Sequence, residues 1–466
     1  MSINTDYERW LLNYVEWANR EPRRPSRNNA ATRAETAALS PGRGRGPFDD
    51  PSKVVAQPHQ PPSTNAPTDG RATFDPFTGD VVTLENHSKV VAIGDVHGDM
   101  LPMLQTLSDA KLIEVDEGIM RLAAVCHTSD DPAQRTRLAL SDDQLNTITW
   151  IGGNAVAIFL GDVLDNRRPS ACTDKWGCCG VTGTQSQMMR LLWSLNEQAK
   201  RHGGRVVWVL GNHCVENTMS DSPGFCASYA PVKHSYSKEG EIAMVTYDTC
   251  TGWGFSDEHI KRVRHWMKRC DCVVMLKIVH HNHVIGAFHG GVTKETAGLL
   301  KSKFVDEKYR LVDPRGGDND EKTRVWGDNL RKINLLFRDA TLEGEEVARE
   351  ITQDRQWIQV MPTWCRPRSL DREPLYNLFG INAAVVGHQV QQGIRCVDGA
   401  GIMMKKTGLV ENGQLCFTDI GMSRAFDDPN GDTKNKIANV GYIVFQANGK
   451  RIEYSINETS RRKDEQ

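Results

Sequence analysis

Short polar motifs follow apolar runs at several points of the chain, and their side chains are of the types that bind metal ions. The first motif sets Asp95 and His97 two residues apart, between Gly94 and Gly98. Glycines let the backbone turn sharply, and alternate side chains of an extended segment project to one side, so this carboxylate and this imidazole can chelate one ion. Taken alone, the motif is also open to another interpretation, in which Asp95 and His97 cap the following helix.

Four further segments repeat the arrangement of an apolar run followed by glycine and ligand residues. They read Gly161-Asp162-Val163-Leu164-Asp165, Gly211-Asn212-His213, His289-Gly290-Gly291 and Gly387-His388-Gln389. Because ligands usually bind at the carboxyl ends of strands in α/β sheets, side chains from separate motifs can converge there. The five motifs together predict a site for two metal ions, and carboxylate, amide and imidazole donors suit Mn, Fe or Zn.

The apolar runs before the motifs have the length and composition of buried β-strands. These runs cover residues 90–94, 155–160, 206–210, 284–288 and 383–386. Helical patterns cover residues 184–202 and 257–269, whereas residues 115–149 and 312–321 are interpreted as excursions from the fold. Strand-length runs that alternate with helical stretches are typical of an α/β fold.

In order and spacing, these motifs resemble those of the calcineurin-like metallophosphoesterases, and within them the phosphoprotein phosphatase family. The resemblance covers residues 90–426, and the sequence GHQV at 387–390 with TDIGMS at 418–423 is most similar to the Shewanella-like protein phosphatase branch. It implies a four-layer α/β/β/α sandwich of two mixed sheets. Residues 81–455 would form this metallophosphoesterase domain, and residues 456–466 a charged tail.

The resemblance also implies a role for each ligand residue. Carried over by position, Asp95 and His97 would hold the first metal and Asp162 would bridge both ions. The second metal would be held by Asn212, His289 and His388. A water or hydroxide between the two divalent or trivalent ions would attack the phosphoester directly.

Two further residues fall at positions of proton transfer in the resembling family. His213 would be the general acid that protonates the leaving alcohol, and Asp165 would orient its imidazole. His213 could instead be a metal ligand or a packed histidine.

The substrate-binding positions depart from the family pattern. Asn166 stands where the family carries an arginine that binds phosphate, and it is followed by Arg167 and Arg168. These two arginines are therefore candidates for substrate binding, although solvent-facing arginines fit the pattern equally well. Cys214 replaces a glutamate, and the thiol is either redox-sensitive or buried and inert.

A second arginine position of the branch is also changed. Asp328 stands near the place of that phosphate-binding arginine, where its charge would repel phosphate unless Arg324 or Arg331 substitutes. Altered arginines beside a complete set of metal ligands indicate changed substrate preference, or a catalytically weak relative.

The N-terminal segment differs in composition from the rest of the chain. Residues 1–20 combine helical spacing of aromatic residues with a capping box at Thr5 and Glu8, which predicts a short amphipathic helix. This helix either packs on the core or docks, through residues 5–20, on a partner or a membrane surface. Residues 21–80 are rich in Pro, Arg and Gly and are predicted to be a disordered linker.

Composition narrows the class of partner and the compartment. Lys and Arg number 57 against 59 Asp and Glu, which gives no reason to expect nucleic acid as a partner. No apolar run has transmembrane length and no secretory pattern is present, so we expect a soluble cytoplasmic protein.

Twelve cysteines are too dilute for a disulfide scaffold, and reduced thiols are expected. A zinc clip formed by Cys172, Cys178, Cys179 and Cys226 is a weaker alternative to ordinary thiols.

These observations predict a phosphoester hydrolase, in particular a serine/threonine-type protein phosphatase. Its substrate would be a phosphorylated protein or a small phosphoester. One alternative is a nucleotide polyphosphate or diester hydrolase, which would share every metal ligand. The other is a binding protein that keeps the fold but has little activity. The nearby histidines His280, His281 and His283 flank an expected hairpin turn and are interpreted as structural.

Overall fold

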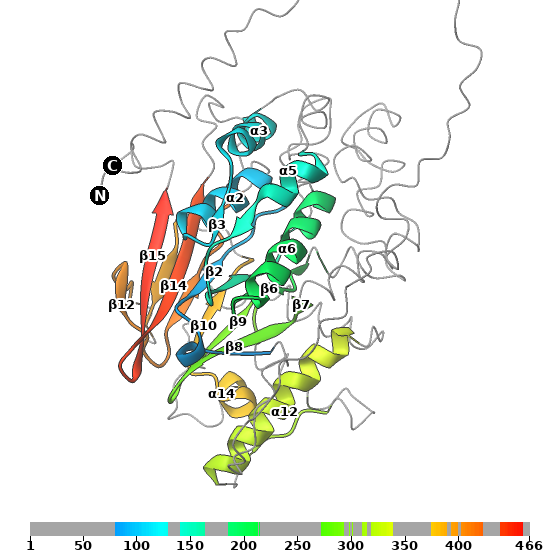
Figure 1. Cartoon of the computed structure of the whole chain (residues 1–466). Coiled ribbons are helices and arrows are strands. Elements are labelled where there is room, and N and C mark those ends of the chain that lie inside the picture. Colours follow the sequence, from blue (N-terminus) through cyan, green and yellow to red (C-terminus); the bar gives the residue numbers. More distant parts are fainter. Residues whose placement is uncertain are drawn as a thin grey trace, which may run out of the picture. The chain divides into compact units, whose positions relative to one another are not determined.

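The apolar runs of the sequence form the strands of two large mixed sheets in the computed structural model, shown in Figure 1. The structure describes residues 80–128, 140–163, 185–212, 214, 272–292, 298, 301, 310–314, 318–338, 374–388, 393–398, 402–422 and 439–459. All of them fall in one compact unit of the chain, Pro76–Gln466.

The seven-stranded sheet has the order β12-β15-β14-β2-β5-β6-β7. Its parallel part consists of β2 (Val90–Ile93), β5 (Val156–Phe159), β6 (Arg205–Val209) and β7 (Cys272–Val273). Antiparallel strands extend it beyond β2, namely β14 (Val440–Asn448), β15 (Arg451–Thr459) and β12 (Thr407–Leu409). Strands β2 and β5 are buried along their whole length, as expected of continuous apolar runs.

The six-stranded sheet has the order β1-β8-β9-β10-β13-β11. Strands β9 (His283–Phe288), β10 (Ala383–Val386) and β13 (Leu415–Phe417) are parallel neighbours. The remaining strands are β1 (Val81–Thr83), β8 (Met275–His280) and β11 (Arg395–Val397). A small third sheet joins β3 (Ile113–Glu114) to β4 (Thr149–Trp150).

Helices pack against both large sheets. Helix α6 (Gln185–Lys200) contacts β6, and α2 (Met100–Asp109) contacts β14 of the seven-stranded sheet. Helix α12 (Asn319–Arg338) contacts β8 of the six-stranded sheet and the short α14 (Pro374–Phe379). The other helices are η2 (Leu84–Asn86), α3 (Glu117–Thr128) and α5 (Asp142–Thr147).

The predicted α/β class and the five predicted strands are confirmed, each strand to within a residue at either end. The helix predicted at 184–202 is α6. The segment at 115–149 is a partly helical insertion, because it contains α3 and α5. Residues 1–79, including the predicted docking helix and most of the linker, and the helix predicted at 257–269 lie outside the described residues. Among the described helices, none is long and apolar enough to cross a membrane.

The expectation of reduced thiols throughout was wrong. Cys396 on β11 and Cys416 on β13 form a disulfide, with their Cα atoms 4.1 Å apart. The two residues are direct partners in the antiparallel pairing of these strands. Cysteine density in the sequence carries no information about strand register, and register is what sets these two thiols opposite each other.

Candidate metal centre

Strand ends from both sheets bring the six predicted metal ligands together. Asp95 and His97 follow β2, Asp162 follows β5 and Asn212 follows β6, whereas His289 and His388 follow β9 and β10 of the other sheet. None of the six is more than 8% exposed. The backbone N–H of His388 donates to the Asp95 carboxylate at 3.1 Å, so the two sheets are linked within the site itself.

His289 stands at the middle of one group of donor atoms. Its Nε2 atom lies 3.0 Å from Oδ1 of Asn212, 3.2 Å from Oδ2 of Asp162 and 3.1 Å from Nδ1 of His388. Its other nitrogen, Nδ1, lies 2.7 Å from the carbonyl oxygen of Leu160. A carbonyl only accepts, so Nδ1 carries a proton, and Nε2 is the nitrogen placed to bind a metal ion, as in many metal-binding histidines.

Asp162 belongs to a second group of donors as well. Nε2 of His97 lies 3.8 Å from a carboxylate oxygen of Asp95 and 3.8 Å from one of Asp162. Within each group, Asp95–His97–Asp162 and Asp162–His289–His388, all donor atoms lie within 4.8 Å of one another. The carboxylate shared by both groups is the one expected to bridge two ions.

Three of the ligand residues have a left-handed backbone, which non-glycine residues rarely adopt. The φ angles are 44° at His97, 35° at Asp162 and 67° at His388. Such conformations concentrate at functional sites, where the surrounding structure holds them. Here the His97 N–H donates to the carbonyl of Asp162 at 2.8 Å and ties the first two motif loops together.

The motif glycines are required by close approach of the ligand side chains. A Cβ atom on Gly211 would collide with the carboxylate and backbone of Asp162, and one on Gly387 would collide with the carboxylate of Asp95. Contacts this short force neighbouring atoms to move. These two glycines therefore leave room for a ligand side chain from a different motif.

Electrostatics of the site favour bound cations. Burial, the nearby Asp419 and also Asp162 raise the pKa of Asp95 well above its usual range. Burial lowers the pKa of His289, but Asp162 and Asp95 outweigh it and raise this pKa to about 9. Buried carboxylates need positive charge beside them, which a protonated imidazole or a bound cation supplies, and this donor set fits first-row transition metals.

Asp419 was not among the predicted site residues. It follows β13, is buried, and accepts a hydrogen bond from the backbone N–H of Gly421 at 3.0 Å. A signal was present in the sequence, because the apolar run Leu415–Phe417 precedes this aspartate as other runs precede the ligands. The run is only three residues long, and it was not interpreted as a strand.

The predicted general acid His213, its partner Asp165, and the predicted substrate-binding residues Arg167 and Arg168 lie outside the described residues. Asn166 and the cysteines of the possible zinc clip lie outside them too. The roles given to these side chains therefore stay predictions. Cys214 is described, and its side chain is buried.

Asp328 does not present an unpaired negative charge. It lies on α12, where its carboxylate is 3.0 Å from Arg331 and 3.5 Å from Arg324. The two arginines considered as replacements for a phosphate-binding residue are therefore both engaged by Asp328. Trp326 on the same helix packs its ring against Gly380 and donates its indole N–H to the carbonyl of Asn377.

Comparisons of sequence give relatives for part of the chain. No protein-family model matches it. It is 30% identical over 161 residues to an uncharacterized protein of Schizosaccharomyces pombe, which covers 34% of this chain and 35% of that protein. It is 24% identical over 137 residues to Shewanella-like protein phosphatase 2 of Arabidopsis thaliana, covering 29% and 23%. The matched part thus spans about a third of the first relative and a quarter of the second.

Similarity to solved structures is low, both in sequence identity and in TM-score. The cold-active protein-tyrosine phosphatase of a psychrophilic Shewanella species is 14% identical, with a TM-score of 0.40 and 82% of both chains covered. The phosphatase domain of the Legionella effector WipB is 14% identical, with a TM-score of 0.35 and coverage of 56% of this chain and 91% of that one. The similarity to the Arabidopsis protein confirms the resemblance to Shewanella-like phosphatases that the motifs indicated.

Proposed function

We propose that this protein is a metal-dependent phosphatase that hydrolyses phosphomonoesters, with phosphorylated proteins of the serine/threonine type as substrates. The observation that carries the proposal is the convergence of Asp162, Asn212 and His388 on the Nε2 atom of His289. These donors come from four motifs and two sheets, and their donor atoms lie close together. The sequence similarity to a Shewanella-like protein phosphatase supports the same function.

Two divalent or trivalent ions, Mn, Fe or Zn, would occupy the two donor groups. When bound, they would polarise the phosphoryl oxygens and supply an activated water for in-line displacement. The chain's own residues prepare this site. The Leu160 carbonyl fixes the tautomer of His289, and the His388 N–H holds the Asp95 carboxylate in place.

Proton transfer and phosphate binding are proposed for residues of the neighbouring loops. His213 directly follows the ligand Asn212, so their Cα atoms are about 3.8 Å apart. An imidazole there can protonate the leaving alcohol, with Asp165 orienting the ring. Arg167 and Arg168 follow Asp165 closely, and a guanidinium at either position can bind two phosphate oxygens.

The proposal also concerns the layered fold, the cellular location and the docking of partners. We propose the four-layer α/β/β/α sandwich within residues 81–455, which is supported by the packing of α6 on one sheet and α12 on the other. The start of the charged tail predicted at 456–466 was wrong, because residues 456–459 pair with β14 as part of β15. The cytoplasmic location and partner docking through residues 5–20 stay predictions.

The experiment that tests the function is hydrolysis of para-nitrophenyl phosphate by the purified full chain, with Mn²⁺ added or with chelator. The Asp95→Asn variant removes one proposed ligand charge, and Asp320→Asn on the exposed start of α12 is the matched control. We expect metal-dependent turnover that is lost in Asp95→Asn and kept in Asp320→Asn. If two ions are bound but no turnover occurs with Mn, Fe or Zn, the proposed enzymatic function is refuted. That result would favour the alternative of a binding protein with little activity.

Substrate class needs a second measurement. Phosphoserine, phosphothreonine and phosphotyrosine peptides are compared with a dinucleoside polyphosphate at equal concentration. We expect the serine and threonine phosphopeptides to be hydrolysed fastest. A preference for phosphotyrosine would contradict the proposed serine/threonine specificity. A preference for the polyphosphate would support the nucleotide hydrolase instead.

A further inference from the structure

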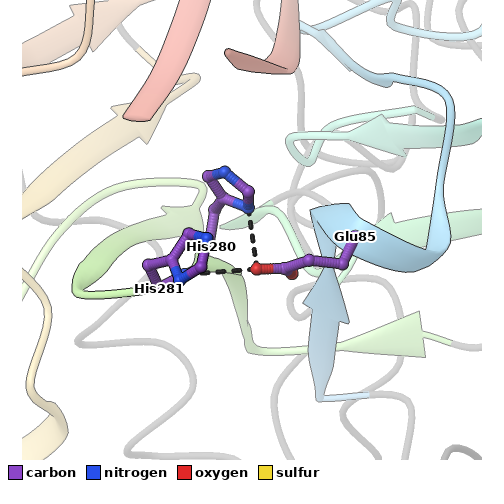
Figure 2. A group of neighbouring side chains, drawn as sticks. All are labelled: Glu85, His280 and His281. Atoms are coloured by element: carbon purple, nitrogen blue, oxygen red, sulfur yellow. Dashed lines mark hydrogen bonds and ion pairs between the residues drawn. The ribbon is translucent and has the colours of Figure 1, made fainter. Parts of the chain in front are cut away.

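Glu85, His280 and His281 form another cluster of metal-binding side chains, shown in Figure 2. His280 ends β8, His281 lies in the two-residue turn between β8 and β9, and Glu85 lies in η2. The six residues of β9 separate this turn from His289, a distance of about 20 Å along an extended strand. The cluster is therefore distinct from the candidate metal centre.

In the imidazole of His280, one nitrogen has a hydrogen-bond partner and the other has none. Nε2 lies 2.8 Å from the carbonyl oxygen of Gly449, and because a carbonyl only accepts, Nε2 carries a proton. Nδ1 lies 2.8 Å from Oε1 of Glu85, but without the geometry of a hydrogen bond. His280 is 3% exposed. If its ring is neutral, the buried lone pair of Nδ1 faces the carboxylate oxygen of Glu85. Such a pair is stable only with positive charge between the two atoms.

His281 supplies a third donor. Its φ angle of 50° belongs to the tight turn, and its ring lies 4.6 Å from that of His280 between centroids. The backbone N–H of His281 donates to Oε1 of Glu85 at 3.3 Å, which holds the carboxylate at the turn. The three donor atoms lie within 4.8 Å of one another. Both His281 and Glu85 are exposed, so their side chains can adjust and water can reach the site.

We propose that Glu85, His280 and His281 bind one divalent first-row transition-metal ion. Two imidazoles and a carboxylate with an open position for water are a common ligand set for Zn²⁺. With bonds of about 2.0–2.1 Å, two adjacent ligands of one ion stand roughly 3 Å apart, close to the Nδ1–Oε1 separation. A bound ion would join η2 to the β8–β9 turn and, through His280, to the β14–β15 turn at Gly449.

Charged groups near the cluster affect cation binding, and a proton can take the place of the metal ion. Burial, Arg451, His280 and His281 lower the pKa of the neighbouring His283. The positive charge of Arg451 opposes an added cation, whereas the negative charge of the Glu85 carboxylate attracts it. A proton on Nδ1 of His280 is the alternative occupant, so the test has to measure metal and not stability alone.

The first test is the zinc content of the full chain after removal of metal with chelator and dialysis against Zn²⁺. Glu85→Gln and His281→Asn each remove one donor at an exposed position, and asparagine tolerates the left-handed backbone of residue 281. His202→Asn, at another exposed histidine, is the matched control. We expect about one zinc ion fewer per chain in both donor variants and no change in His202→Asn. Equal zinc content in all four proteins would overturn the proposal.

The second test separates this cluster from the candidate metal centre. In the Asp162→Asn background the centre is impaired but the cluster is intact. Added Zn²⁺ should still raise the thermal midpoint of this variant, and adding His281→Asn should abolish that rise, because ligand binding to the folded state stabilises it. An unchanged rise in the double variant would also refute the site. Neither result depends on phosphatase activity, so failure here leaves the proposed function standing.

Discussion

Nδ1 of His388 lies 3.1 Å from Nε2 of His289, although the two histidines lie 99 residues apart in the chain. Each ring comes from the end of a different strand, and the strands β9 and β10 are parallel neighbours. Nδ1 of His289 faces the carbonyl oxygen of Leu160, so Nε2 is the nitrogen that faces the other ring. An ion bound by both nitrogens is the arrangement that satisfies them.

Replacing the shared carboxylate should remove both ions together. Asp162→Asn keeps the size of the side chain, and asparagine tolerates the φ angle of 35° at this position. Without the bridging charge we expect the candidate metal centre to lose its ions, so that the metal content of the chain falls by about two, and hydrolysis to be lost. Elemental analysis beside a para-nitrophenyl phosphate assay measures both. Full activity in this variant would rule out the two-metal site.

A single methyl group at a motif glycine should disturb the centre. Gly211→Ala sets a Cβ against the carboxylate of Asp162, whereas Gly298→Ala adds one into open space. We expect Gly211→Ala to lower kcat/KM on the order of 100-fold, because small displacements of reacting groups are costly, with the fold retained. Gly298→Ala should match the wild type in kcat/KM and in its circular dichroism spectrum. Equal kinetics of both variants would contradict the close packing.

The proposed general acid should affect turnover without affecting metal binding. Replacing His213 with asparagine should lower kcat by roughly two to four orders of magnitude, the usual contribution of general acid catalysis. The metal content should stay at the wild-type value, measured on the same preparation. Loss of metal in this variant would identify His213 as a ligand. A His202→Asn variant controls for removal of an exposed histidine.

The buried Lys277 should make stability depend on pH. Burial lowers the pKa of this lysine from 10.5 to about 7, and the side chain donates to the carbonyl of Trp326 at 3.3 Å. Between pH 7 and 10.5 the unfolded chain binds this proton and the folded chain does not, so stability rises with pH across that window. Below pH 7 both states are protonated, and the cost of the buried charge is at its full value.

Lys277→Met isolates this contribution. Methionine fills similar space without a charge, so the variant should be more stable than the wild type at pH 7, by an amount on the order of 4 kcal/mol at most. The difference should shrink as the pH approaches 10. Urea unfolding of both proteins at several pH values measures it. A difference that does not change with pH would show that Lys277 is charged in both states.

The sequence alone was enough to predict five strands and the residues that gather in the candidate metal centre. Each of these five strands is a run of apolar residues that is followed by a glycine or a predicted ligand residue, so local pattern contained the information. The six ligands predicted from five motifs all lie within the centre. Their assignment to two groups came from the resemblance to a known family, because spacing along the chain does not state which motifs become neighbours.

Tertiary structure decided the features that depend on register and on contact between distant segments. Asp419 reaches the neighbourhood of Asp95 because β13 pairs beside β10. Cys396 and Cys416 join because they are opposite each other across one strand pair. His280 was interpreted as structural from its turn sequence, yet η2 brings a carboxylate to it from 195 positions earlier in the chain. Local sequence determines whether a segment forms a helix or a strand. Which side chains meet depends on how these elements pair, and that pairing exists only in the folded chain.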